Sequence, residues 1–244
     1  MRDWERLMFL IANDKGGVGK STVLSLIVGW HRARGRDPKL FDTDAINQSF
    51  RDFFPEAEIV DTKQENALDK VLRSMIDSPL AIVDNHAGGI EDSERGFLAW
   101  VDGIELFEWA PQKGLGLTIG VIVNEIKANN RNVGRIMKSI GEKVNWVVFR
   151  NFRGVKNTSA WDESEQREIA RGLEAAGRAF GVEVPVIDRG LTQQMDSLSK
   201  PLEGLKLASY DWAADARQRK VLRQFYSQLD EISEVLTVTE VEKV

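Results

Sequence analysis

The chain has 244 residues, 42% of them hydrophobic and 29% charged, with a net charge of -5 and no cysteine. This length and composition fit one α/β domain with a large core. The absence of cysteine excludes disulfides, thiolate metal sites and cysteine nucleophiles, and the negative net charge disfavours a surface that binds polyanions all over while leaving local basic patches open.

The first residues, Met1–Arg6, are mostly charged and lead directly into an apolar run, so we expect no signal peptide. No apolar run is long enough to span a membrane. We therefore expect a cytoplasmic protein that forms one domain over residues 1–244.

A glycine-rich stretch follows the apolar run Leu7–Ala12 and precedes a helical pattern from Val23 to about Arg34. Strand, glycine-rich turn, Lys-Ser and helix form the arrangement of a phosphate-binding loop. Glycines let consecutive backbone N–H groups face an anion, and the N-terminus of the following helix adds further donors. The match over eight consecutive residues disfavours the alternative, a glycine-rich turn without a ligand. The candidate nucleotide-binding residues are Lys15, Gly16, Gly17, Val18, Gly19, Lys20, Ser21 and Thr22.

Two expected strands end on aspartates. The strand Lys39–Phe41 leads into Asp42-Thr43-Asp44, and the buried run Leu80–Val83 leads into Asp84. The carboxyl ends of parallel strands meet at one edge of a sheet, where the phosphate loop also lies. We expect Asp84 to approach Mg²⁺, because an apolar strand that ends in Asp after a phosphate loop is typical of a Walker B segment. The polar stretch 47–50 could line the same pocket, and the segment 86–89 is either a switch loop or a simple turn.

The rest of the chain alternates between the two element types. Further strands are expected at 104–109, 117–123, 144–149 and 184–187. Helices are expected at about 64–77, 91–101, 129–141, 163–180 and 210–236, followed by an acidic tail. This alternation predicts an α/β fold with a doubly wound, mostly parallel sheet flanked by helices. The apolar stripe of the C-terminal helix is expected to pack on the chain's own core rather than on a partner.

The glycine-rich loop also carries a second lysine, Lys15, and has Asp14 where the general pattern has its first glycine. This combination resembles the deviant Walker loop, KGGVGK[ST]T, of the ParA/MinD partition and positioning ATPases. Within that class, the stretch Phe41–Phe50 and the pair Asp84-Asn85 resemble the TraL/StbB-type ATPases of conjugative plasmids. The resemblance covers residues 7 to about 200.

The resemblance implies ATP and Mg²⁺ as cofactors and assigns roles to the matching residues. Lys15, Lys20, Asp42 and Asp44 would be catalytic, with either Asp42 or Asp44 orienting the attacking water. The metal ligands would be Ser21, Asp42 and Asp84. Asn151 occupies the place of an asparagine that contacts adenine, although Phe152 stands between it and the arginine that usually follows directly. Lys15 would cross a dimer interface to the partner's nucleotide.

These roles imply a slow, Mg²⁺-dependent ATPase that forms a homodimer on binding ATP and that partitions or positions DNA or a cargo. A partner protein would stimulate hydrolysis or act as the cargo adaptor. Non-specific DNA binding in the ATP state is supported by two basic clusters, although ordinary solvated helix faces explain either cluster about as well. The clusters are Lys127, Arg131, Arg135, Lys138, Lys143, Arg150, Arg153 and Lys156, and Arg217, Arg219, Lys220 and Arg223.

Three other functions are compatible with a phosphate-binding loop. A MinD-like positioning ATPase would act through protein or membrane partners without binding DNA. The acidic tail 238–244 would be repelled by anionic lipid, so we expect no membrane contact. An ATP-dependent synthetic or reductive enzyme is disfavoured because no second substrate site is evident, and an iron-protein role would require cysteine. A scaffold without hydrolysis is disfavoured because the residues expected to bind and hydrolyse ATP are intact: Lys20, Ser21, Asp42, Asp44 and Asp84.

Overall fold

The computed structural model describes residues 4–62, 64, 66–86, 89, 96–152, 158–205 and 211–238. Within these ranges seven strands form one sheet in the order β3-β2-β4-β1-β5-β6-β7, and every pair is parallel. The strands are β1 Arg6–Ile11, β2 Lys39–Asp42, β3 Glu58–Ile59, β4 Leu80–Asp84, β5 Leu115–Val123, β6 Asn145–Arg150 and β7 Ala179–Glu183. The α/β class and the parallel sheet are confirmed.

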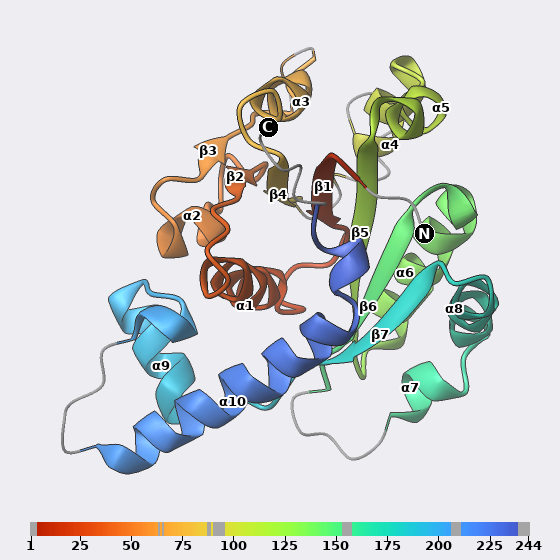
Figure 1. Cartoon of the computed structure of the whole chain (residues 1–244). Helices are drawn as coiled ribbons and strands as arrows, with labels where there is room; N and C mark the ends of the chain where they lie inside the picture. Colours follow the sequence, from red (N-terminus) through yellow and green to blue (C-terminus); the bar gives the residue numbers. More distant parts are fainter. Residues whose placement is uncertain are drawn as a thin grey trace.

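Helices cover both faces of the sheet (Figure 1). They are α1 Lys20–Arg32, α2 Ser49–Phe53, α3 Asp69–Ser74, α4 Phe97–Gly103, α5 Leu106–Trp109, α6 Lys127–Ile140, α7 Ser159–Asp162, α8 Glu165–Ala175, α9 Arg189–Leu198 and α10 Trp212–Glu231. Short 3₁₀ turns lie at Ala110–Lys113, Gly141–Lys143, Leu202–Gly204 and Ser233–Val235.

The core consists of two apolar layers, one on each side of the sheet. Met8 and Leu10 of β1 belong to the layer under α3, α4, α6 and α8, whereas Phe9 and Ile11 belong to the layer under α1, α2, α9 and α10. This alternation is the side-chain period of a strand that is buried on both faces. Central strands such as β5, which is buried along its whole length, therefore read as continuous apolar runs.

Two expected strands are wrong in type or position. Residues 104–105 form a turn and 106–109 form α5, where Leu106 is fully buried and the Trp109 indole donates to the Ile104 carbonyl at 2.7 Å. A short apolar run fits a buried strand and a buried helix equally well, so its periodicity alone cannot choose between them.

The last strand lies at 179–183 instead of 184–187, and the helix expected over 163–180 ends at Ala175. Gly177 makes the turn between them with φ 67°, in the left-handed region that favours glycine. Pro185, which lacks a backbone N–H, falls just after the strand.

The C-terminal helix spans Trp212–Glu231, a little shorter than the expected 210–236. Its buried side chains, Phe225 and Leu229 among them, pack on the layer that also contains α1. The expectation that its apolar face covers the chain's own core is confirmed. The acidic tail from residue 239 lies outside the described residues.

Candidate functional site

The phosphate loop connects the carboxyl end of β1 to α1. Gly17 and Gly19 have φ 73° and 102°, and Gly19 is the residue immediately before the helix. These values lie in the left-handed region, which glycine adopts without the cost that a Cβ would impose. No described side chain caps the N-terminus of α1, so its first backbone N–H groups are available to an anion.

A pocket of about 410 Å³ opens beside this loop. It brings the loop together with residues that follow β2 and β4, as their shared sheet edge predicts. The lining residues are Gly16, Gly17, Gly19, Lys20, Ser21, Thr22, Asp44, Asn47, Ser49, Asp84, Asn85 and His86. The expectation that residues near 47–50 line the same pocket is confirmed for Asn47 and Ser49.

Ser21 and Asp84 form the part of the pocket that suits a divalent cation. The Ser21 hydroxyl lies 3.3 Å from Oδ2 of Asp84 and 2.7 Å from the Ser49 hydroxyl. Oδ1 of Asp84 is buried and has no hydrogen-bond partner among the described residues. A hydroxyl beside a carboxylate with a spare oxygen is the hard donor set that Mg²⁺ prefers, and Mg²⁺ sites use only one or two carboxylates. The residues present therefore fit Mg²⁺.

The charge on Asp84 is costly without a cation. Burial raises the pKa of Asp84 to about 7; the neighbouring Lys20 ammonium acts against this shift and the Asp42 carboxylate adds to it. A buried carboxylate with a raised pKa in a cleft is a recognised mark of a functional site.

Asp42 and Asp44 lie differently with respect to the pocket. Asp42 is 1% exposed, and its two oxygens accept the backbone N–H groups of Asp44 at 2.8 Å and of Arg51 at 3.2 Å. Burial raises the pKa of Asp42, and these two hydrogen bonds oppose the shift. Asp44 lines the pocket, and its Oδ1 accepts from the backbone of Ile46 and Asn47. Asp42 thus holds the segment between β2 and α2, whereas Asp44 faces the pocket.

The two lysines of the loop also differ. Lys20 is half-buried and lines the pocket, whereas Lys15 is exposed and lies outside its lining. Lys15 is therefore at the surface of the loop, next to a residue that lines the pocket but not itself part of the lining.

Asn151 braces the loop from behind. Its side-chain Nδ2 donates to the Val18 carbonyl at 2.8 Å, and its backbone N–H donates to the Val123 carbonyl at 2.9 Å. A Cβ on Gly19 would lie only 2.6 Å from this Nδ2, so glycine is also required there for close approach. Asn151 joins the phosphate loop to the end of β6, and its expected contact with adenine remains a prediction.

A group of buried asparagines secures the start of the loop, and the sequence interpretation missed it. Asn13 exchanges two hydrogen bonds with the backbone of Ile122, at 2.9 and 2.8 Å, and donates to Asn129 Oδ1 at 3.1 Å. Asn130 bonds both the N–H and the carbonyl of Asn124. The adjacent Asn129-Asn130 pair in an otherwise amphipathic helix was the available signal, because buried amides need partners.

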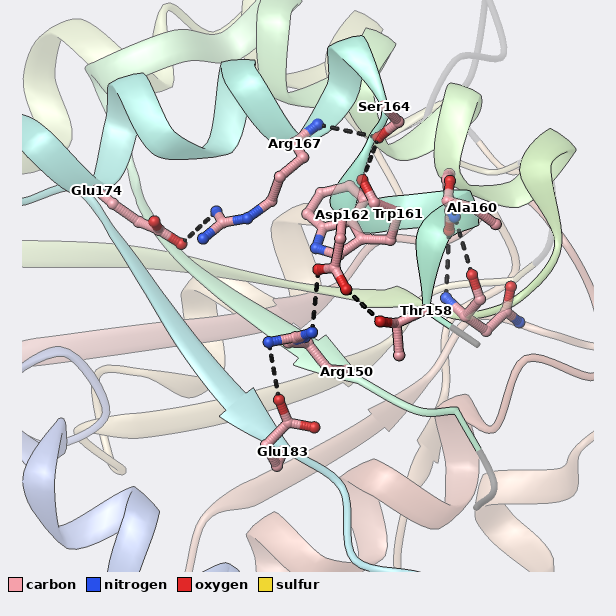
Figure 2. A network of polar contacts seen from close by, with 11 residues as sticks. Arg150, Thr158, Ala160, Trp161, Asp162, Ser164, Arg167, Glu174 and Glu183 are labelled. Carbon is pink, nitrogen blue, oxygen red and sulfur yellow. Dashed lines mark hydrogen bonds and ion pairs between the residues drawn. The ribbon is translucent and has the colours of Figure 1, made fainter. Parts of the chain in front are cut away.

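The first basic cluster divides into two parts. Lys127, Arg131, Arg135 and Lys138 are all exposed on α6. Arg150, by contrast, pairs with Asp162 at 3.1 Å and with Glu183 at 3.0 Å, as Figure 2 shows. Two carboxylates neutralise this guanidinium, so Arg150 is not a free phosphate contact. Arg153 and Lys156 lie outside the described residues.

The second cluster lies on α10. Arg217 pairs with Asp188 and Arg219 with Asp215. Lys220 and Arg223 are exposed and have no carboxylate partner among the described residues. Trp212, on the same helix, is 79% exposed.

The chain is similar to known proteins in its structure and not in its sequence. No protein-family model matches this sequence, and no curated protein is significantly similar to it. Among solved structures, MinD in the MinC:MinD cell division protein complex of Aquifex aeolicus matches with a TM-score of 0.58 at 14% identity, over 97% of this chain and 98% of that one. The chain has the fold of MinD. A second structure, the MinD cell division protein of Aquifex aeolicus, matches with a TM-score of 0.50 at 14% identity, over 95% and 99% of the two chains.

No described helix combines the length and the apolar character needed to cross a lipid bilayer.

Proposed function

We propose that the chain is a Mg²⁺-dependent ATPase of the ParA/MinD type, one domain over residues 1–244, that acts in the cytoplasm as a nucleotide-controlled switch. The observation that carries this proposal is the shared pocket, in which the glycine loop and Lys20 face Ser21 and Asp84. The MinD fold supports it, because this fold places such a loop at the carboxyl edge of a parallel sheet.

Phosphoryl transfer to water needs positioning and charge neutralisation more than covalent chemistry. The backbone N–H groups of residues 16–21 and the Lys20 ammonium would hold the phosphates. Ser21 and Asp84 would hold Mg²⁺, directly or through water, and the ion when bound neutralises charge on the phosphate oxygens. Asp44 is favoured over Asp42 for orienting the attacking water, because Asp44 lines the pocket and both oxygens of Asp42 accept backbone hydrogen bonds.

The catalytic part of the proposal is tested by nucleotide binding and phosphate release, with and without Mg²⁺. The wild-type chain should bind ATP, and Lys20→Ala should weaken that binding by about tenfold or more. Asp84→Asn should instead reduce the dependence of ATP binding and phosphate release on Mg²⁺. If the wild-type chain binds neither ATP nor ADP, the proposal is wrong.

We also propose that ATP drives formation of a homodimer in which Lys15 reaches the partner's nucleotide. The exposed position of Lys15 outside its own pocket supports this arrangement. Large apolar side chains are also exposed just beyond strand ends: Ile46 after β2 is 80% exposed and Val186 after β7 is 57% exposed. Apolar side chains on the nucleotide edge suit a surface that becomes covered in a dimer.

For the task of the switch, we propose partition or positioning of DNA, in the manner of the TraL/StbB-type ATPases of conjugative plasmids. Lys127, Arg131 and Lys138 of α6, with Lys220 and Arg223 of α10, are exposed basic residues that could contact phosphates. A DNA-shift assay with ATP, ADP or no nucleotide across a salt series tests this proposal. Binding should require ATP, ignore sequence and weaken steeply with salt. Absence of binding under every condition would exclude DNA as the cargo.

The second candidate is a positioning ATPase that acts through a protein partner without DNA. The observation that favours it is that one of the similar structures is MinD in complex with MinC. The same DNA-shift assay separates the two candidates, because here ATP-dependent dimerisation would occur without any DNA complex.

A further inference from the structure

Helices α6 and α8 lie on the opposite side of the sheet from α1 and α10 (Figure 1). A groove with apolar lining residues lies between α6 and α8. It has a volume of about 690 Å³. Four apolar residues line it: Met137, Ile140 and Leu173, which belong to the core and are at most 7% exposed, and Ile169, which is half-buried. The groove belongs neither to the nucleotide pocket nor to the carboxyl edge of the sheet.

The rim of the groove is basic. Lys138, Lys143 and Arg178 line it, and Glu142 is the one acidic residue among its described lining. Lys138 also ends the exposed row Lys127, Arg131, Arg135 and Lys138, whose spacings of four, four and three residues place it along one side of α6. Nearby Arg171 already pairs with Glu168 and adds no net charge.

Gly172 keeps one wall of the groove open. It is an exposed residue of α8, and a Cβ at this position would meet nothing within 4 Å. Glycine inside a helix costs about 1 kcal/mol relative to alanine. Because Gly172 has no side chain, a gap remains between Ile169 and Leu173. Any larger side chain at position 172 would project into the groove.

We propose that this groove binds a short amphipathic helix of a partner protein, with apolar residues on one face and Asp or Glu on the other. Charge complementarity selects the occupant: three cations on the rim face one carboxylate, so an acidic segment is attracted and a basic one is repelled. Duplex DNA suits the site less well, because phosphates gain nothing from apolar walls. The binding itself does not depend on the proposed function. Only the identity of the partner does, because we take it to be the protein that regulates the switch or links it to cargo.

The test uses a fluorescein-labelled designed peptide with leucines at every third or fourth position and glutamates elsewhere, titrated into the full chain without nucleotide. A second peptide carries lysines in place of the glutamates. The glutamate peptide should bind saturably and more weakly at high salt, and the lysine peptide should not bind. Because no nucleotide is present, a failure of ATP binding or dimerisation would leave this measurement unchanged.

Two substitutions locate the binding. Gly172→Leu should fill the groove and weaken the glutamate peptide by about tenfold or more, whereas Gly103→Leu is the matched control at another exposed helical glycine with open space around it. Lys138→Glu, at an exposed position, should also weaken binding of the glutamate peptide. It replaces Gly172→Leu as the test if that variant does not fold.

Three results would overturn the proposal. They are no binding of the glutamate peptide, equal binding of the two peptides, and equal binding by wild type and both groove variants. Duplex DNA and vesicles with anionic phospholipid are titrated in parallel. If Gly172→Leu abolishes the binding of either of these and spares the peptide, the groove serves that ligand instead.

Discussion

Glu203 and Tyr226 meet over a glycine of α1. A Cβ on Gly29 would lie 2.5 Å from both Cδ of Glu203 and the Tyr226 hydroxyl, so glycine allows these polar groups to approach the helix. Oε2 of Glu203 has no partner among the described residues. Burial raises the pKa of Glu203 to about 7, opposed by the positive charge of Arg32.

This carboxyl group should make stability fall as the pH rises. The folded chain keeps a proton on Glu203 up to a pH of about 7, whereas the unfolded chain releases it near 4.5. Stability is therefore full below the lower value and is lost as the pH rises through the upper one. We expect Glu203→Gln to be neutral at pH 5 and to stabilise by about 2 kcal/mol at pH 8.5, raising Tm by roughly 4–8 °C.

Thermal unfolding measures the Tm of wild type and of Glu203→Gln between pH 5 and pH 8.5. Subtracting one Tm from the other cancels the contribution of the other groups that titrate in this range. Tyr226→Phe is the control, because it removes the neighbouring hydroxyl and leaves the carboxyl group. A Tm difference between wild type and Glu203→Gln that stays constant with pH would contradict the prediction.

Asn151 offers a second prediction at the scale of single residues. Its Nδ2 is the donor to the Val18 carbonyl of the phosphate loop. Asn151→Asp replaces that donor with an acceptor of almost the same shape and places negative charge beside the loop. We expect ATP affinity to fall by about tenfold or more, and by less in Asn151→Ala, which removes the donor without adding charge. Calorimetric titration with ATP measures both, and equal affinity of the Asp variant and wild type would show that this bond does not hold the loop.

Two helical glycines allow a matched prediction at the scale of elements. A Cβ on Gly134 of α6 would lie 2.2 Å from Cγ and 2.8 Å from Cβ of Gln166 in α8, so α6 and α8 pack closely there. At Gly172 the same Cβ meets nothing within 4 Å. Gly134→Ala should destabilise by about 1–3 kcal/mol through overpacking. Gly172→Ala should stabilise by up to about 1 kcal/mol through helix propensity.

Urea unfolding measures both variants. The informative result is their opposite sign, because the substitution is identical and only the space around it differs. If both alanines stabilise, α8 shifts to accommodate Gly134→Ala, and the contact between the two helices is looser than the structure indicates.

Elements were predictable where one signal dominated. The continuous apolar run of β5 and the glycine loop before α1 could be placed from sequence because nothing competes with those patterns. Residues 104–109 could not, since a short apolar run with a buried residue such as Leu106 is compatible with either element. The shift of the last strand to 179–183 likewise depended on pairing with β6, which is a long-range contact.

The same limit applies to the site. The loop and Asp84 follow from local patterns and from the common edge of a parallel sheet. The neutralisation of Arg150 does not, because its partners Asp162 and Glu183 come from α7 and from the end of β7. The different orientations of Asp42 and Asp44 also do not follow from local patterns, because Asp42 accepts a hydrogen bond from the backbone of Arg51 in α2. Sequence thus predicted that the loop and Asp84 meet at one pocket, while the opposing charges and hydrogen bonds required the tertiary structure.

For the whole molecule, the proposed dimer leads to a complementation experiment. In a mixed dimer of Lys15→Ala and Lys20→Ala subunits, the first subunit keeps its own Lys20 and receives Lys15 from the second. One of the two sites is then complete and the other lacks both lysines. For each variant alone, the rate of ATP hydrolysis should fall by about 100-fold or more. An equal mixture should recover about a quarter of wild-type activity, because about half of the dimers are mixed and each has one complete site.

Phosphate release measures the recovery, and native mass spectrometry of the same mixture measures how much mixed dimer has formed. If mixed dimers are present and activity does not recover, Lys15 does not act on the partner's nucleotide. If Lys15→Ala alone hydrolyses ATP as the wild type does, the exposed lysine has no catalytic role. Recovery in proportion to the mixed dimer would show that two chains share each site, since neither variant has both lysines.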